Sequence, residues 1–230
     1  MPTPAGDAPR FVASSDRTVR HDDPVWARQG WIVVWVIAGA VLSVLTAPLA
    51  VGLARDQLHV RCEADPLGGD SFICADGIGY LESLAVLLCA AVVPAFLSGL
   101  LIFVNPSRTT RTRLLVVVAI AGIAWAFLAT WFLVHRSHGL ADTAAYWSGA
   151  LLPAALILAA ASATALGSVF GSGRIRVIGL RTAAVLVLAA TLVQPGLAVC
   201  TLTAAGILAA AAAGASATQG APSRSDRADP

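Results

Sequence analysis

The stretch that decides the fold is LLVVVAIAGIAWAFLATWFLV, residues 114–134, which contains no charged residue and no histidine. A helix needs about 20 apolar residues to cross the hydrocarbon core of a bilayer, because each residue adds about 1.5 Å to a path of roughly 30 Å. The 21 residues of this stretch meet that requirement. They are therefore expected to form a transmembrane helix.

Four further gaps between charged residues contain apolar runs of the same kind. The expected spans cover residues 31–53, 83–104, 148–170 and 181–213. A charge at the centre of such a helix would cost about 2.5–3.5 kcal/mol on insertion scales, so five gaps together are a strong signal. We predict an all-α protein, a polytopic transmembrane helical bundle of about five spans.

Composition favours the same class of protein. Hydrophobic residues make up 57% of the chain and charged residues only 12%, whereas about a quarter of an average soluble domain is charged. All 15 basic residues are arginine, and the net charge of +2 does not indicate a nucleic-acid partner. The alanine, valine and arginine bias fits a bacterial chain encoded in GC-rich DNA.

The placement of arginine predicts the orientation. Residues 105–113 and 171–181 each carry three arginines and no acid, whereas acids outnumber arginines in residues 54–82. Short basic loops stay in the cytoplasm, so we expect a cytoplasmic N-terminus, an outer loop at 54–82 and, with five spans, an outer C-terminus. The polar segments 1–30 and 214–230 are predicted to be disordered, with a helix beginning near Pro24. The protein is expected in the bacterial cytoplasmic membrane.

The last span is the least regular. Gln194, Pro195 and Gly196 lie in the middle of residues 181–213. Proline removes one helical hydrogen bond and bends a helix, so we predict one kinked and tilted span. The alanine run at 209–213 is expected to project beyond the lipid.

Cys62 and Cys74 lie in the predicted outer loop, twelve positions apart. Disulfides persist on the oxidising side of a membrane, so we predict a structural disulfide. A redox-active pair is the alternative, with Cys89 as a relay partner, but catalytic pairs often have the closer C-x-x-C spacing.

A metal site is a second hypothesis for the outer face. His135 and His138 share one helical face, and His59 and Asp142 could complete a set of ligands for zinc, copper or iron. The alternative is a solvated helix end. No other cofactor is predicted.

Polar residues within the spans suggest a third kind of site. Ser98, Thr130 and Gln194 are candidates for lining a polar cavity, whereas acids, histidines and arginines are absent from the span centres. Because buried charge marks ion pathways, a charge-driven pump is disfavoured. Small residues also recur four apart, as helix contacts require, at Gly39, Ser43 and Ala47, at Gly122, Ala126 and Thr130, and at Ala155, Ala159, Ala163 and Gly167.

These residues favour a non-enzymatic accessory or interaction component of the membrane, in contact with lipid and with other membrane proteins. A permease or exporter subunit for a neutral or apolar solute is the first alternative. The second is an outer-face redox or metal-binding membrane enzyme. Gly-rich phosphate loops and familiar hydrolase motifs are absent from the sequence.

Overall fold

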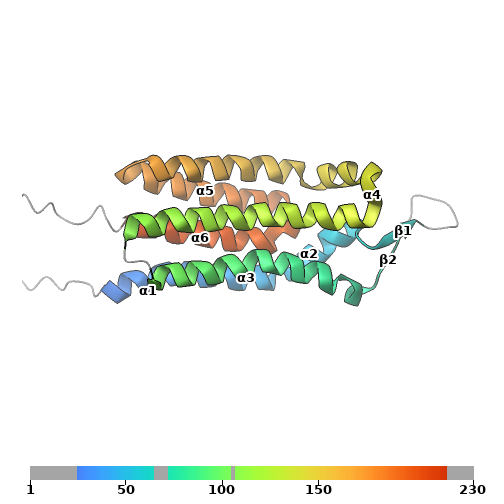
Figure 1. The fold of residues 1–230 in the computed structure, drawn as a ribbon, viewed down its shortest axis with the longest axis horizontal. Helices are drawn as coiled ribbons and strands as arrows, with labels where there is room; N and C mark the ends of the chain where they lie inside the picture. The colour runs from blue at the N-terminus through green and yellow to red at the C-terminus, as the bar shows by residue number, and fades with distance from the viewer. Residues whose placement is uncertain (1–24, 65–71, 105–106, 217–230) are drawn as a thin grey trace, which may run out of the picture.

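The computed structural model describes residues 25–64, 72–104 and 107–216, apart from the side chains of residues 25–29, 64 and 138–142. It shows a bundle of long helices with a small hairpin of strands at one end (Figure 1). In chain order the elements are α1 (Val25–Leu45), α2 (Ala47–Gly52), a π-helical turn (Leu53–Gln57), β1 (Cys62–Ala64), β2 (Phe72–Cys74), a 3-10 turn (Gly77–Tyr80), α3 (Leu81–Val104), α4 (Arg108–Phe170), α5 (Gly173–Val193), a second 3-10 turn (Pro195–Leu197) and α6 (Ala198–Ser216). The prediction of an all-α bundle is confirmed. The predicted disordered segments lie mostly outside the described residues.

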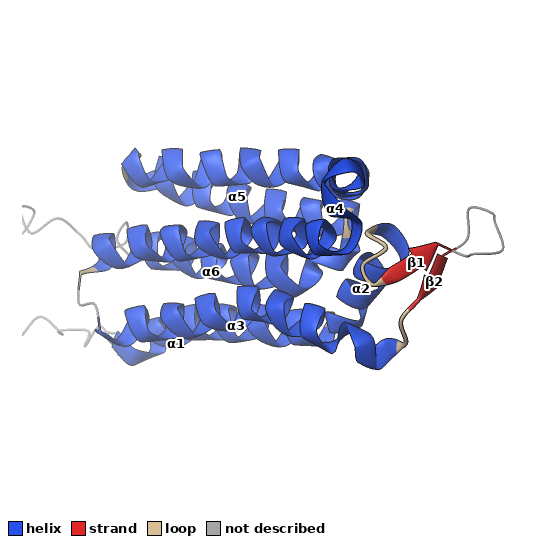
Figure 2. Ribbon diagram, turned by 45° about the vertical axis from the view of Figure 1, so that its right-hand side comes forward, coloured by secondary structure: helices blue, strands red, loops and turns tan. Residues whose placement is uncertain are grey.

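Helix α4 folds back on itself and makes two antiparallel legs, Arg108–Ser137 and Thr143–Phe170 (Figure 2). The indole N–H of Trp147 on the second leg donates to the Thr130 hydroxyl on the first leg at 3.2 Å. The Trp131 ring meets the Trp147 ring edge-on, with centroids 5.7 Å apart. These contacts join the two legs near the turn. The predicted spans 114–134 and 148–170 lie one on each leg.

Five helical segments are long and apolar enough to cross a membrane by themselves, which confirms the predicted number of about five spans. They are Gly77–Val104, Arg108–Ser137, Thr143–Phe170, Gly173–Val193 and Pro195–Ser216. A sixth crossing is formed if the pair Gly30–Leu45 and Ala47–Gln57, bent by 49°, counts as one span. Pro48 lies at the start of α2, just after the bend, and its missing amide hydrogen interrupts the helical hydrogen bonds there.

The prediction of a single kinked span over residues 181–213 is wrong. Helix α5 ends at Val193, and α6 runs back beside it after the turn at Pro195–Leu197. The Thr191 and Thr201 hydroxyls, on either side of this turn, are 2.7 Å apart. The stretch before the proline is long enough to cross alone because α5 begins at Gly173, eight residues before Arg181. Arginines can form part of the end of a membrane-spanning helix, because their apolar stems lie along the helix while the charged guanidinium groups reach water.

Because α6 returns, α1 begins and α6 ends at the same end of the bundle, on the left of Figure 1. The described helices therefore do not support the prediction of an outer C-terminus opposite a cytoplasmic N-terminus, and the termini themselves lie outside the described residues. We call this end the arginine end, since the first two turns of α4 and the first turn of α5 contribute five arginines there: Arg108, Arg111, Arg113, Arg174 and Arg176. The opposite end carries β1 and β2 and is called the disulfide end.

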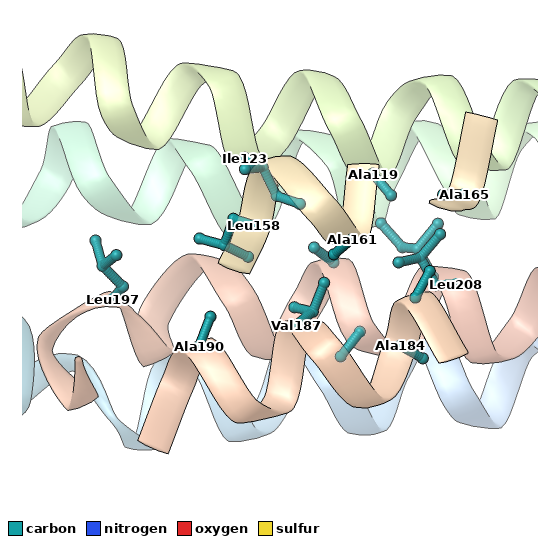
Figure 3. Packing of buried hydrophobic residues seen from close by; sticks show 14 of the residues in the cluster. Ala119, Ile123, Leu158, Ala161, Ala165, Ala184, Val187, Ala190, Leu197 and Leu208 are labelled. Atoms are coloured by element: carbon teal, nitrogen blue, oxygen red, sulfur yellow. The ribbon is translucent and has the colours of Figure 1, made fainter. Parts of the chain in front are cut away.

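Helix α6 forms the centre of the bundle. In its most apolar stretch 83% of the residues are buried, against 28–44% in the other four long spans. Leu208 belongs to the same buried hydrophobic cluster as Val187 of α5 and Leu158 of the second leg of α4, and Figure 3 shows side chains of this cluster. Residues 210–212 are fully buried among these helices, so the expectation that the alanine run projects beyond the lipid is wrong.

Glycine brings α1 and α6 into backbone contact. A Cβ atom on Gly206 would lie 2.5 Å from the Trp35 carbonyl oxygen, and one on Gly39 would lie 2.7 Å from the Leu202 carbonyl oxygen. One turn further along, the Ser43 and Thr203 hydroxyls are 2.8 Å apart and both side chains are buried. The predicted small-residue contact of the first span thus faces α6 at Gly39 and Ser43.

That α6 ends on the side of the membrane where α4 begins can be tested by labelling. In a chain carrying Cys89→Ala and Cys200→Ala, Ser107→Cys and Ser216→Cys should react with a membrane-impermeant maleimide from one side only. Asp56→Cys, at the disulfide end, should react from the other side. Labelling of Ser107→Cys and Ser216→Cys from opposite sides would contradict the fold.

Because the backbones of α1 and α6 are in contact, one methyl group added at this contact should destabilise the protein strongly. Gly206→Ala should lower the thermal midpoint of the purified protein, followed by tryptophan fluorescence in detergent, because α1 must move away; overpacking of this kind costs about 1–3 kcal/mol. Gly167→Ala is the matched control, since nothing lies within 4 Å of a Cβ atom there. Its midpoint should be unchanged or higher, and equal midpoints for the two variants would refute the close contact.

Candidate functional site at the disulfide end

The hairpin at the disulfide end is closed by a covalent bond. Cys62 and Cys74 form the predicted disulfide, and they lie opposite each other in the antiparallel pair β1–β2, with Cα atoms 4.0 Å apart. A two-stranded hairpin is marginally stable alone in water. The disulfide therefore stabilises an element that projects beyond the helices (Figure 2).

Arg61, just before β1, attaches this hairpin to α3 and α4. Its guanidinium donates to the Gly79 carbonyl at 2.7 Å and forms an ion pair with Glu82 in the first turn of α3. Its backbone N–H donates to the Ser137 hydroxyl on α4 at 3.4 Å. Arg136 contacts the second oxygen of the Glu82 carboxylate at 3.3 Å. One carboxylate thus holds two arginines from different parts of the chain.

Two of the residues that precede β1 have a positive φ angle, a backbone conformation that residues other than glycine disfavour. His59 has φ 48° and Arg61 has φ 59°. Such conformations cost of order 1–3 kcal/mol each and persist only where surrounding contacts impose them. Here the imposing contacts are the Arg61 bonds and the packing of the His59 ring, whose centroid lies 4.4 Å from that of Phe72 and 5.3 Å from that of Tyr146. Strained backbone of this kind clusters at functional sites.

A cavity of about 370 Å³ opens beside this network. Its charged lining comes from Arg61, Glu63, Glu82 and Arg136, and Leu133 supplies an apolar wall. The volume is within the range of small-molecule sites. With cations and carboxylates on its walls, the cavity can accept a polar side chain of another protein or a small polar molecule.

The predicted metal ligands are only partly described. His59 and His135 both lie at this end, and each has a buried Nδ1 atom without a hydrogen-bond partner among the described residues. No group of three or more His, Cys, Asp or Glu side chains within the described ranges could hold a metal ion. The side chains of His138 and Asp142 lie outside the description, so the complete four-residue site stays a prediction.

The two remaining cysteines lie apart from the disulfide. Cys200 is buried on α6, with its sulfur 3.9 Å from the Leu87 carbonyl oxygen. Cys89 is exposed on α3, about 12 Å along the helix from Leu81. The geometry adds no support to an electron relay from the disulfide to Cys89.

The structure does not bring Ser98, Thr130 and Gln194 together. The Gln194 amide, at the turn into α6, donates to the Gln57 side-chain oxygen at 2.6 Å and to the Ala150 carbonyl at 2.7 Å. Thr130 pairs with Trp147. Ser98 is buried on α3 without a partner among the described residues, about 25 Å along that helix from its start at the disulfide end. Each therefore belongs to a different local contact.

The network of Arg61, Glu82 and Arg136 was not predicted from the sequence. Glu82 lies at the edge of the predicted outer loop, and Arg136 lies just after a predicted span, where charged residues are common. The three residues are 21 and 54 positions apart along the chain, so no local pattern joins them. An acid placed exactly at the start of an apolar span is the one signal that could have drawn attention to Glu82.

No family model, no curated protein and no solved structure matches this chain. The fold itself defines the class, a multi-pass integral membrane protein with a disulfide-linked hairpin at one end.

Removal of the disulfide should loosen the hairpin and leave the bundle intact. The cross-link spans twelve positions and contributes about 3 kcal/mol in the chain-entropy model. In a chain carrying Cys62→Ser and Cys74→Ser, we expect faster amide hydrogen exchange over β1 and β2 and unchanged exchange in α5 and α6. Cys89→Ser is the matched control and should leave both regions unchanged. Faster exchange in α6 would show that the hairpin stabilises the whole bundle.

Proposed function

We propose that this protein is a non-enzymatic interaction component of a bacterial cytoplasmic membrane, and that it contacts a protein partner through the hairpin at its disulfide end. The N-terminus lies in the cytoplasm in this proposal, and the hairpin faces outward. Membrane lipid surrounds the helices.

The observation that carries the proposal is exposed apolar surface on a cross-linked element. Ile73, at the centre of β2, has 60% of its surface exposed, and Phe72 beside it has 37%. An apolar side chain held outside a bundle, next to charged groups, is typical of a protein–protein contact. The charged groups here are Arg61, Glu63 and Arg136 around the cavity.

The hairpin is also held in one conformation before any partner arrives. The disulfide, the Arg61 bonds and the contact of His59 with Phe72 fix β1 and β2 relative to α3 and α4. A surface that is ordered in advance loses less entropy on binding. This supports a recognition role for the hairpin.

Polar side chains from different elements of the bundle pair with one another. Ser43 pairs with Thr203, Thr191 with Thr201, and Gln194 with Gln57. Pairs between helices of this kind join a scaffold. They favour a packed interaction component over a path for a solute.

Charge supports the orientation. Every described carboxylate side chain, namely Asp56, Glu63, Asp76 and Glu82, lies at the disulfide end, whereas the first turns of α4 and α5 carry arginine and no acid. Arginine-rich ends face the cytoplasm. The hairpin then faces the oxidising side, where its disulfide persists.

Site-specific photo-crosslinking tests this function. A benzophenone amino acid at Ile73 should yield one discrete protein adduct in intact membranes, because this side chain projects from the hairpin toward the partner. Leu192 is the matched control position, since it lies at the same end of the bundle and is 83% exposed on α5. The adduct should be identified by mass spectrometry after purification of the chain.

Three outcomes are informative. An adduct from position 73 that is absent from position 192, and that is lost with Cys62→Ser and Cys74→Ser, supports a partner at the hairpin. An adduct at twice the 23.5 kDa mass of the chain identifies the partner as a second copy. Adducts with lipid alone from both positions would refute the proposal.

A further inference from the structure

An apolar groove of about 290 Å³ runs along the surface between α3 and the first leg of α4, away from the hairpin. Its walls include Val93 and Leu97 on α3 and Val117, Ala121 and Trp125 on α4. Val117 and Trp125 each expose about half of their surface. The groove therefore faces the lipid.

Proline and glycine create the groove. Pro94 lies within α3, and a Cβ atom on Gly122 would lie 3.0 Å from the Pro94 ring. The two helices touch at this point, so the larger side chains beside it spread apart. The Trp125 indole N–H donates to the Val86 carbonyl at 3.3 Å and closes the groove toward the disulfide end.

The groove leads to a positive charge that has no ion-pair partner among the described residues. Arg113, Val117, Ala121 and Trp125 are spaced by four and lie on one face of the helix. Arg113 is exposed, and all three salt bridges among the described residues involve other residues, at the disulfide end. A side chain on a helix leans toward the helix N-terminus, so Arg113 extends from the groove toward the arginine end.

The dimensions fit one leaflet of a bilayer. Twelve residues separate Arg113 from Trp125, which is about 18 Å along the helix. One half of the hydrocarbon core is about 15 Å thick. An extended acyl chain that starts beside Arg113 would therefore reach the middle of the membrane at Trp125.

We propose that this groove binds an anionic glycerophospholipid, with one acyl chain between α3 and the first leg of α4 and the phosphate on Arg113. The arginine supplies the charge complement, and the exposed valine and tryptophan side chains supply the apolar contact. This site is independent of the hairpin and of the partner proposed above.

Native mass spectrometry of the intact protein tests the site. The protein is released from detergent in an equimolar mixture of phosphatidylglycerol and phosphatidylcholine with identical acyl chains. We expect one retained phosphatidylglycerol, and Arg113→Gln should weaken its binding about fivefold, because one arginine near a lipid phosphate contributes about 1 kcal/mol. Arg174→Gln, which removes another exposed arginine at the same end, should have no effect.

A second pair of variants tests the groove itself. Ala121→Phe, and separately Val117→Trp, fill the groove and should reduce retention of both lipids. Ala160→Phe places the same bulk at an exposed position on the second leg of α4 and should behave like the unmodified chain. All three positions are exposed, so the bundle is expected to fold in each variant, and circular dichroism checks this.

The proposal is overturned if Arg113→Gln matches Arg174→Gln, or if Ala121→Phe and Val117→Trp both retain as much lipid as Ala160→Phe. Either result would mean that the retained lipid is a general annulus. Equal retention of the two lipids by the unmodified chain, or recovery of a neutral isoprenoid in the groove from native membranes, would overturn the anionic lipid as the occupant.

Discussion

The structure depends on the burial of α6, an alanine- and glycine-rich helix that the other helices surround. Helices in lipid associate through close packing and hydrogen bonds, because lipid tails are as apolar as the side chains they would replace. Small side chains are therefore what makes α6 a suitable centre. Gly206 lets the backbone of α1 approach at Gly39, and Ser43 then bonds to Thr203 across the same contact. Exposed to lipid, the same alanines would hold the helix only weakly.

The burial of α6 also explains the turn that precedes it. At Gln194 the backbone leaves the helix, and Pro195 has no amide hydrogen to continue it. Polar groups at such a break need partners, because an unsatisfied one costs free energy in an apolar setting. The Gln194 side chain finds them in Gln57, beyond α2, and in the Ala150 carbonyl on α4. The Gln194 side-chain amide thus connects the bent segment after α1 with the turn that leads into α6.

Apolar runs between charges were enough to predict the spans of α3 and of both legs of α4, because the cost of burying a charge in lipid is large and local. The division of residues 181–213 could not be predicted in the same way. Arg174, Arg176 and Arg181 were counted as a loop, although their long stems let them join α5. The disulfide could be predicted because its two cysteines lie in an outer loop, on the oxidising side, twelve positions apart. The ion pairs of Glu82 could not be predicted, because they form only when α3, α4 and the residue before β1 meet in space.

The two ends of the bundle differ in whether their charged side chains are paired, and this difference bears on the kind of partner that each end can contact. At the disulfide end, Glu82 neutralises arginines within the chain, so Ile73 and Phe72 are left as the outward apolar surface. Salt bridges this exposed contribute little free energy, about 0–1 kcal/mol each, so their main effect is to fix geometry. At the arginine end, Arg108, Arg113 and Arg174 are exposed and form no salt bridge with a described carboxylate. Among the described residues, this separation of carboxylates from exposed arginines is what both proposals rest on, protein contact at one end and anionic lipid at the other.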